Sequence, residues 1–201
     1  MKAGVLFSGG KDSSLAALLL SRDYEVGLHT FVFSAEREIP AVKAAARALG
    51  FPLEKHIFDE GLLEKAVNLV IEHGYPNDAI NLVHREAAYA LARTHTVIGD
   101  GTRFDDRVPL LTRSDVQRIG SLHGCSVVRP LLGYGRTEVD RLTGRYLQVA
   151  YGETGTIANG DYETELRKAC RERGVDPATL FPPRHEQSLV TGRKIHQEET
   201  S

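Results

Sequence analysis

A polar turn near the start of the chain holds the residues best suited to chemistry. It reads S-G-G-K-D-S-S over positions 8–14, between an apolar run at 5–7 and an apolar-periodic segment that begins at Leu15. A glycine turn between a strand and a helix presents free backbone N–H groups and the positive end of the helix dipole to an anion. The glycines let a phosphate approach the backbone, and Lys11 adds a cation. The carboxylate of Asp12 beside such a cradle indicates a divalent cation, because the ion would separate two negative groups.

A second polar stretch follows an apolar segment much later in the chain. It reads G-D-G-T-R-F-D-D-R over positions 99–107. Glycines at the end of a strand permit the close approach of a ribose or a base. The adjacent carboxylates of Asp105 and Asp106 could hold Mg²⁺ through water, and the side chains of Arg103 and Arg107 could bind phosphate oxygens. The alternative interpretation is an acidic surface turn at the start of a helix.

Alternating strands and helices must position these two stretches. Runs rich in β-branched and aromatic residues predict strands, and apolar residues at helical spacing predict helices. The predicted strands are 3–7, 26–33, 53–58, 96–99 and 126–128. The predicted helices are 13–22, 39–49, 59–71, 76–93, 114–122, 137–147 and 162–173.

This order predicts an α/β fold of the Rossmann-like, doubly wound type, with a parallel sheet covered by helices on both faces. Ligands of such sheets bind at the carboxyl ends of the strands. That edge would bring together the turn after the first strand, the end of the second strand and the loop after the fourth. We expect one domain over residues 1–150 and an irregular, partly helical appendage over 151–201, whose role in substrate or subunit contact stays open.

The turn at 8–14 is not the common phosphate-binding loop G-x-x-x-x-G-K-[S/T], because Asp12 follows Lys11 and Val5 occupies the first glycine position. The turn also lacks the G-x-G-x-x-G pattern of dinucleotide-binding folds. It resembles the PP-loop of the ATP pyrophosphatases, which are adenine nucleotide alpha hydrolases of the HUP-like fold. The stretch D-G-T-R-F-D-D at 100–106 is similar to the D-G-T-N-x-D-D form of that family's second motif. The C-terminal segment resembles the tails of uncharacterised archaeal members of the family.

The resemblance covers residues 1 to about 147 and implies both a ligand and a reaction. The cofactors would be ATP and Mg²⁺, and ATP would be cleaved between the α- and β-phosphates to adenylate a substrate. The residues implied to hold the phosphates and the metal are Ser8, Gly9, Gly10, Lys11, Asp12 and Ser13. Catalysis would rest on Lys11, Asp12 and Arg103. Adenine would pack on Phe31 and Phe33, the nucleoside would lie near Gly99 and Thr102, and the metal ligands would be Asp12, Asp105 and Asp106.

The acceptor of the adenylate stays open. Amidation or amine ligation is favoured over sulfur transfer to tRNA or a cofactor, because sulfur transfer usually recruits cysteine pairs and this chain has no C-x-x-C. Cys125, beside Arg129, could still supply a thiolate, whereas Cys170 is less well placed. A hypothesis of another class is a nucleotide sensor that catalyses no reaction. The presence of both Lys11 and Asp12 argues against it.

Histidines carry weaker predictions. His29 and His56 lie within predicted strands and are expected as core or edge residues. His84, in the helix after residue 76, could face either the site or the core. His185 lies close to Gln187 near the C-terminus, and a single histidine of this kind is more often structural than catalytic.

Composition limits the partners. The 201 residues are 41% hydrophobic, enough for a full core, and the net charge of −2 gives no overall attraction to nucleic acid or a membrane. Arginines are concentrated between positions 103 and 145, so RNA contact stays open, as does a homo-oligomer. The first strand begins directly after Met1 and Lys2, which leaves no room for a signal peptide, and the longest apolar run is too short to span a membrane. We therefore expect a cytoplasmic protein whose partners are ATP and an unknown acceptor.

Overall fold

The main sheet has five parallel strands in the order β3-β2-β1-β4-β5. The computed structural model describes residues 1–153, 156–182 and 186–194. The strands are β1 (Lys2–Leu6), β2 (Glu25–Val32), β3 (Leu53–Ile57), β4 (Val97–Gly99) and β5 (Ser126–Val128). The predicted α/β, Rossmann-like fold is confirmed, and each predicted strand lies within about one residue of its observed position.

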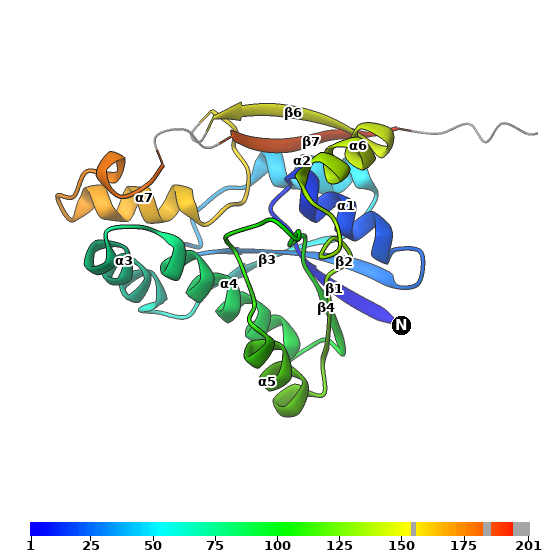
Figure 1. The fold of residues 1–201 in the computed structure, drawn as a ribbon, viewed down its shortest axis with the longest axis horizontal. Helices are drawn as coiled ribbons and strands as arrows, with labels where there is room; N and C mark the ends of the chain where they lie inside the picture. Colours follow the sequence, from blue (N-terminus) through cyan, green and yellow to red (C-terminus); the bar gives the residue numbers. More distant parts are fainter. Residues whose placement is uncertain (154–155, 183–185, 195–201) are drawn as a thin grey trace, which may run out of the picture.

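Helices cover both faces of this sheet (Figure 1). One face packs against α1 (Lys11–Leu20), α2 (Pro40–Leu49) and α6 (Arg136–Tyr146), and the other against α3 (Leu62–His73), α4 (Asn77–Ala92) and α5 (Arg113–His123). In α4 the buried residues Val83, Ala87 and Leu91 recur every four positions, so a single stripe faces the sheet. No helix in the described ranges is long and apolar enough to cross a membrane.

The direction of winding changes between β1 and β4, which lie side by side in the sheet although their sequences are far apart. Gly4 of β1 pairs with Ile98 of β4, whereas the other neighbour of β1 is β2. In open parallel sheets, the crevice beyond the carboxyl ends of two such strands is where ligands bind. The polar turn at 8–14 leaves β1 and the second polar stretch leaves β4, so both end at this crevice.

A second, two-stranded antiparallel sheet was not predicted from the sequence. It consists of β6 (Leu147–Glu153) and β7 (Glu186–Arg193), and it packs over α1 and α2 (Figure 1). Val190 of β7 is 1% exposed and joins the core on that face. The expected boundary at residue 150 falls inside β6. Between the two strands lie α7 (Glu163–Glu172), which contacts α3, and the short 3₁₀ helix Pro177–Thr179.

Candidate functional site

A cavity of about 470 Å³ opens at the carboxyl ends of β1 and β4, where the winding direction changes. This volume lies within the range of pockets that hold small molecules and cofactors. Its walls come from the turn at 8–14, the loop after β4, the segment 159–163 and the start of β7. The cavity is at the sheet edge where the sequence placed a ligand site.

Most of the residues singled out in the sequence lie around this cavity. Those that line it are Ser8, Gly10, Lys11, Asp12, Ser13, Phe31, Thr102, Arg103 and Asp106. Those that do not line it are Gly9, Phe33, Gly99 and Asp105. The two predicted polar stretches are therefore brought together by the fold, and the exceptions have individual structural reasons.

The turn at 8–14 has the geometry of an anion cradle. Gly9 has φ +82°, a conformation that residues with a Cβ rarely adopt, and Gly10 follows as the N-cap of α1. The N-cap glycine has no side chain to cap the helix, and the N–H of Lys11 donates instead to Ser188 Oγ, while the positive end of the helix dipole lies at the cavity wall. The hydroxyl groups of Ser13 and Ser14 donate to the carbonyl of Gly10 over 3.2 and 2.8 Å, which holds the turn in place.

Lys11 and Arg103, two cations of the cavity wall, are paired with carboxylates. Lys11, 5% exposed, places Nζ 2.7 Å from Asp12 Oδ1 and 3.0 Å from Asp140 Oδ1. Arg103 lies 3.6 Å from the other oxygen of Asp12 and 2.5 Å from Asp106. Burial alone would lower the pKa of Arg103, but the nearby carboxylates, Asp12 first among them, raise it, so the guanidinium keeps its charge. The carboxylates therefore hold both cations in fixed positions.

The contacts of Asp105 and Asp106 correct the expectation that these residues hold a metal ion. Both oxygens of Asp106 are used by Arg103, one by its side chain and the other by its backbone N–H at 2.8 Å. Asp105 Oδ2 accepts the backbone N–H of Arg136 at 2.8 Å, in the first turn of α6. The two carboxylates therefore orient Arg103 and cap the start of α6. A position at the start of a helix was the alternative interpretation of this stretch in the sequence. Of the two predicted metal ligands that line the cavity, Asp12 has the more exposed carboxylate, 31% against 16% for Asp106.

Phe33 and Gly99 are also placed differently from the prediction that they contact the nucleoside. The ring of Phe33 packs on Phe58, at 4.8 Å between centroids, outside the cavity lining. A Cβ at Gly99 would lie 2.6 Å from Leu20 Cδ1, so this glycine permits helix α1 to approach the sheet rather than a ligand. Phe31 does line the cavity, at its apolar end.

The loop after β4 touches the first turn of α1 closely at Gly101. A Cβ at this position would lie 2.5 Å from the backbone nitrogen of Ser13 and 2.6 Å from the carbonyl carbon of Asp12. Only glycine fits between these backbones. The contact fixes Thr102 and Arg103 against the anion cradle, and it had no signal in the sequence beyond a glycine after a strand.

A buried His84–Asp100 pair forms another wall of the cavity. His84 Nε2 lies 3.2 Å from Asp100 Oδ2, and the backbone N–H of Thr102 donates to Asp100 Oδ1 at 2.9 Å. Burial alone would raise the pKa of Asp100, but the hydrogen bond and charge of His84 hold it below its usual value. The centroid of the Tyr162 ring lies 6.3 Å from that of the His84 ring. Burial raises the pKa of the Tyr162 hydroxyl. The sequence left His84 open between core and site, and the structure places it in the site.

Exchanging Asp100 for asparagine is expected to lower the free energy of unfolding by about 2 kcal/mol at pH 7, because a buried charged acceptor of His84 is lost. Since the pKa of Asp100 in the folded state lies below its ordinary value of 3.8, its stabilisation is present above that pH and is lost as the pH falls through the folded pKa. Urea unfolding at pH 7 and pH 3 should show the difference from wild type shrinking at pH 3. The exposed control Asp23→Asn should change stability by less than about 0.5 kcal/mol. An equal Asp100→Asn loss at both pH values would contradict this account.

The C-terminal strand β7 completes the site, which the sequence did not indicate. The backbone N–H of Lys11 donates to Ser188 Oγ at 3.1 Å, and that of Val190 donates to the carbonyl of Gly9 at 2.9 Å. The segment before α7 adds a third link, from the Gly160 N–H to the carbonyl of Ser8 at 2.7 Å. Residues of the segment expected as an appendage thus hold the anion cradle directly.

Two buried oxygen atoms of cavity-lining residues have no hydrogen-bond partner among the described residues. They are Oγ1 of Thr102, which the sequence assigned to the ligand, and Oε1 of Gln187, which the sequence noted only beside His185. Unpaired buried polar atoms are uncommon, and at a cavity wall they indicate a ligand or water that satisfies them. His185 lies outside the described residues.

The two cysteines do not contribute to the cavity. Cys125 and Cys170 are both buried and lie outside its lining. Burial raises the pKa of both thiols, which disfavours the reactive thiolate. The structure thus removes the local basis for thiolate chemistry at Cys125.

Comparison with known proteins places this site within a family. The model of a family of unknown function, DUF7411, matches residues 1–192. The chain belongs to the DUF7411 family. The match includes both polar stretches and β7, so the whole cavity lies within the family region.

A curated relative and a solved structure, both from the archaeon Methanocaldococcus jannaschii, extend the comparison. Uncharacterized protein MJ0690 is 37% identical over 195 residues, covering 96% of this chain and 97% of its own. A crystal structure described as a predicted subunit of tRNA methyltransferase is 36% identical and covers 98% of this chain and 99% of its own, with a TM-score of 0.88. The five-stranded core and the added C-terminal sheet are therefore a fold already seen by experiment.

Proposed function

We propose that this DUF7411 protein binds Mg²⁺·ATP in the cavity and cleaves it between the α- and β-phosphates to adenylate a tRNA. The observation that carries the proposal is the buried Lys11, set beside Asp12 and Arg103 at the N-terminus of α1. Backbone amides, two cations and one partly exposed carboxylate match the charges of a metal-bound polyphosphate. The resemblance of both polar stretches to the PP-loop family points to the same ligand.

The residues that line the cavity fit a magnesium ion and a nucleotide. Asp12 would hold the magnesium ion, which supplies neutralisation of the leaving pyrophosphate when bound. The unpaired oxygens of Thr102 and Gln187 offer hydrogen-bond acceptors or donors to a nucleotide, and the apolar end beside Phe31 suits a base. The cavity lining therefore offers both polar and apolar contacts, as a nucleotide requires.

In the proposed reaction, an oxygen of the acceptor attacks the α-phosphorus and the bond to the bridging β-oxygen breaks. Lys11 and Arg103 would stabilise the charge that develops on the phosphate oxygens, and the first amides of α1 would orient them. Transfer of a phosphoryl or adenylyl group is mainly positioning and electrostatics, so no protein nucleophile is needed. The adenylate would then react with ammonia or an amine, since neither cysteine lines the cavity.

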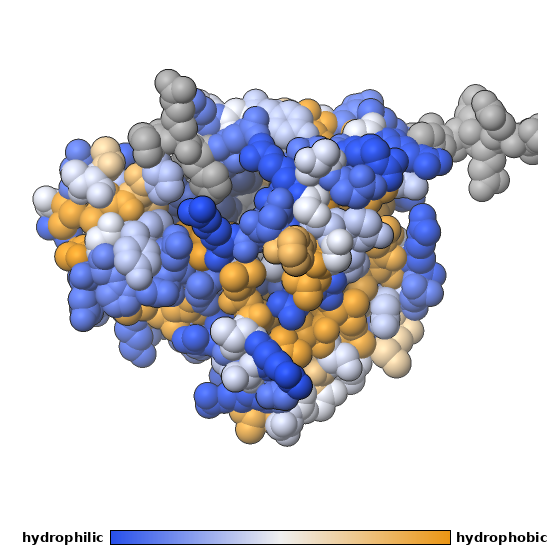
Figure 2. Space-filling model, in the orientation of Figure 1, coloured by the Kyte–Doolittle hydropathy of each residue, from blue (hydrophilic) through white to orange (hydrophobic). Residues whose placement is uncertain are grey.

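The choice of tRNA rests on the relative described as a predicted subunit of tRNA methyltransferase. The surface near the cavity supports it. Phe104, beside Arg103, is 77% exposed, and its backbone N–H donates to the carbonyl of Tyr134, which is 40% exposed. Figure 2 shows hydrophobic residues exposed amid hydrophilic surface on the face of the molecule drawn there. Aromatic rings beside arginines are the groups on which unpaired RNA bases stack.

The test is to incubate the protein with Mg²⁺, ATP labelled at the α-phosphate and tRNA transcripts, and to separate the products. AMP or adenylated RNA with an equal amount of pyrophosphate is the expected result. ADP with phosphate would contradict α-phosphate cleavage, and ATP binding without turnover on any tRNA would favour the sensor. A parallel reaction with labelled S-adenosylmethionine examines methyl transfer, which would replace the adenylation proposal if it alone were observed.

Replacing Asp12 by alanine is expected to weaken binding of Mg²⁺·ATP by at least about tenfold while changing AMP binding little. The carboxylate contributes through the metal and the polyphosphate, and AMP has neither a β- nor a γ-phosphate. Calorimetric titration with both nucleotides measures the two effects, with Asp23→Ala as an exposed acidic control. Equal losses for ATP and AMP would remove the metal role from Asp12.

A further inference from the structure

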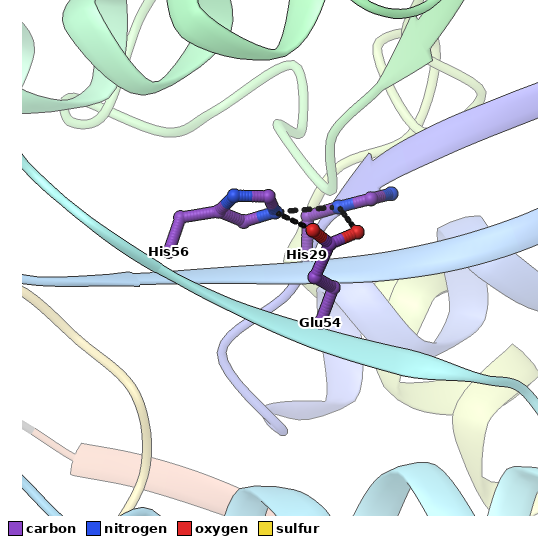
Figure 3. A group of neighbouring side chains, drawn as sticks. All are labelled: His29, Glu54 and His56. Atoms are coloured by element: carbon purple, nitrogen blue, oxygen red, sulfur yellow. Dashed lines mark hydrogen bonds and ion pairs between the residues drawn. The ribbon is translucent and has the colours of Figure 1, made fainter.

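Three side chains outside the anion cradle lie together on the strands β2 and β3. His29 of β2 stands opposite Glu54 of β3 in the parallel register, and His56 lies two positions further along β3. Because side chains alternate between the faces of a strand, Glu54 and His56 project to the same face as His29. Figure 3 shows the three polar groups converging on one point between the strands.

The distances between the donor atoms suit a small metal ion. His29 Nδ1 lies 2.8 Å from His56 Nε2 and 3.7 Å from a carboxylate oxygen of Glu54, and the other oxygen lies 3.9 Å from His56 Nε2. One ligand atom from each residue lies within 4.8 Å of the other two. Bonds of about 2.0–2.1 Å in a tetrahedron place ligand atoms about 3.3–3.5 Å apart, so the two imidazole nitrogens, now in hydrogen-bond contact, would separate by about 0.5–0.7 Å to seat an ion.

The surroundings keep the two imidazole rings neutral and leave one side of the group open to solvent. Burial, with the neighbouring His95 and His56, lowers the pKa of His29 to about 4, and burial lowers that of His56. Neutral rings carry the lone pairs that a metal requires. The ring of His95 stands edge-on to that of His29, with 4.7 Å between the ring centroids, and His95 Nδ1 lies 2.9 Å from Thr94 Oγ1. The His95 ring thus covers the inner side of the group. The Glu54 side chain is 65% exposed and leaves the outer side to water.

We propose that His29, Glu54 and His56 bind a zinc-type divalent ion with a fourth coordination position open to solvent. Two imidazoles and one carboxylate form a ligand set that zinc uses where it keeps an exchangeable position. Within the described ranges this is the one group of three such ligands at metal-binding separation. The ion would join β2 to the edge strand β3, and His29 also lines the cavity. The site thus lies beside the proposed nucleotide site and shares none of its anion-binding residues.

The test is calorimetric titration of the metal-free full-length protein with Zn²⁺, followed by visible spectroscopy with Co²⁺. We expect one saturable ion per chain and the absorption of four-coordinate cobalt. His56→Ala and Glu54→Ala should each weaken binding by at least about tenfold. His73→Ala is the matched control. His73 lies in α3, outside this group, and its Nδ1 is 2.7 Å from Asp78 Oδ2.

Circular dichroism of each variant establishes folding, and the partly exposed positions 54 and 56 are chosen because replacing the buried His29 could unfold the sheet. Lys11→Met should leave Zn²⁺ affinity unchanged, which separates this site from the nucleotide proposal. Absence of saturable binding, six-coordinate cobalt, or affinity that survives both His56→Ala and Glu54→Ala would each overturn the assignment.

Discussion

Replacing Lys11 by methionine is expected to slow pyrophosphate release from ATP by about 10²- to 10³-fold, the effect of removing one preorganised group that stabilises transition-state charge. The ammonium group is buried, so solvent does not screen it, and it lies at the start of α1 beside Arg103. Methionine keeps the length of the side chain and removes the charge. Asp12 and Asp140 would then lose their shared cation, which adds repulsion to the incoming polyphosphate.

Single-turnover measurement of pyrophosphate with saturating Mg²⁺·ATP distinguishes a slower chemical step from weaker binding. Lys43→Met is the matched control, because Lys43 is an exposed lysine whose nearest acid is Glu38 at 3.6 Å. Urea unfolding of both variants measures any loss of stability separately. A Lys11→Met protein that is folded and retains the wild-type rate would remove Lys11 from the reaction.

Introducing a single methyl group at Gly101 is expected to cost about 3 kcal/mol of folding free energy and to weaken ATP binding by at least about tenfold. The new Cβ would meet the backbone of Asp12 and Ser13 at 2.5–2.9 Å, and a helix start cannot yield as a side-chain tip can. The loop would have to withdraw, and Arg103 would move away from Asp12. Urea unfolding and calorimetric titration of Gly101→Ala with Mg²⁺·ATP measure the two effects.

The matched control for this substitution is Gly144→Ala in α6. A Cβ at Gly144 has no atom within 4 Å, and alanine is the better helix residue, so this variant should be stabilised by about 0.5–1 kcal/mol. ATP affinity should be unchanged. If Gly101→Ala bound ATP as tightly as Gly144→Ala, the close approach at Gly101 would have no part in shaping the site.

The main sheet was predictable because each strand has a local signal in the sequence and the central strands β1, β2 and β4 are largely buried. The run from Val26 to Phe33 is β-branched and aromatic, and Gly50 ends α2 in a left-handed conformation, as its position in the sequence indicated. The polar turns at the ends of β1 and β4 could be assigned to one edge because parallel strands point the same way. The chemistry of Lys11 and Asp12 as a polyphosphate site stays a prediction that the geometry supports.

The remaining parts of the site depend on contacts that no local pattern encodes. In β7, Gln187 and Val190 are buried while Thr191 is exposed, so the strand shows little alternation of apolar and polar residues. Asp105 and Asp106 resemble a metal pair in the sequence, yet their oxygens are taken by backbone groups and by Arg103, whose positions only the fold determines. His29 and Glu54 are adjacent through strand register alone.

The link between Lys11 and Ser188 spans 177 positions of sequence and has a consequence for biosynthesis. A chain emerging from the ribosome exposes the anion cradle long before it exposes β7. The core strands can pair earlier, because domains fold as their residues become available. A nascent chain therefore acquires its sheet before it acquires a complete cavity, and any binding that needs the whole cavity waits for β7.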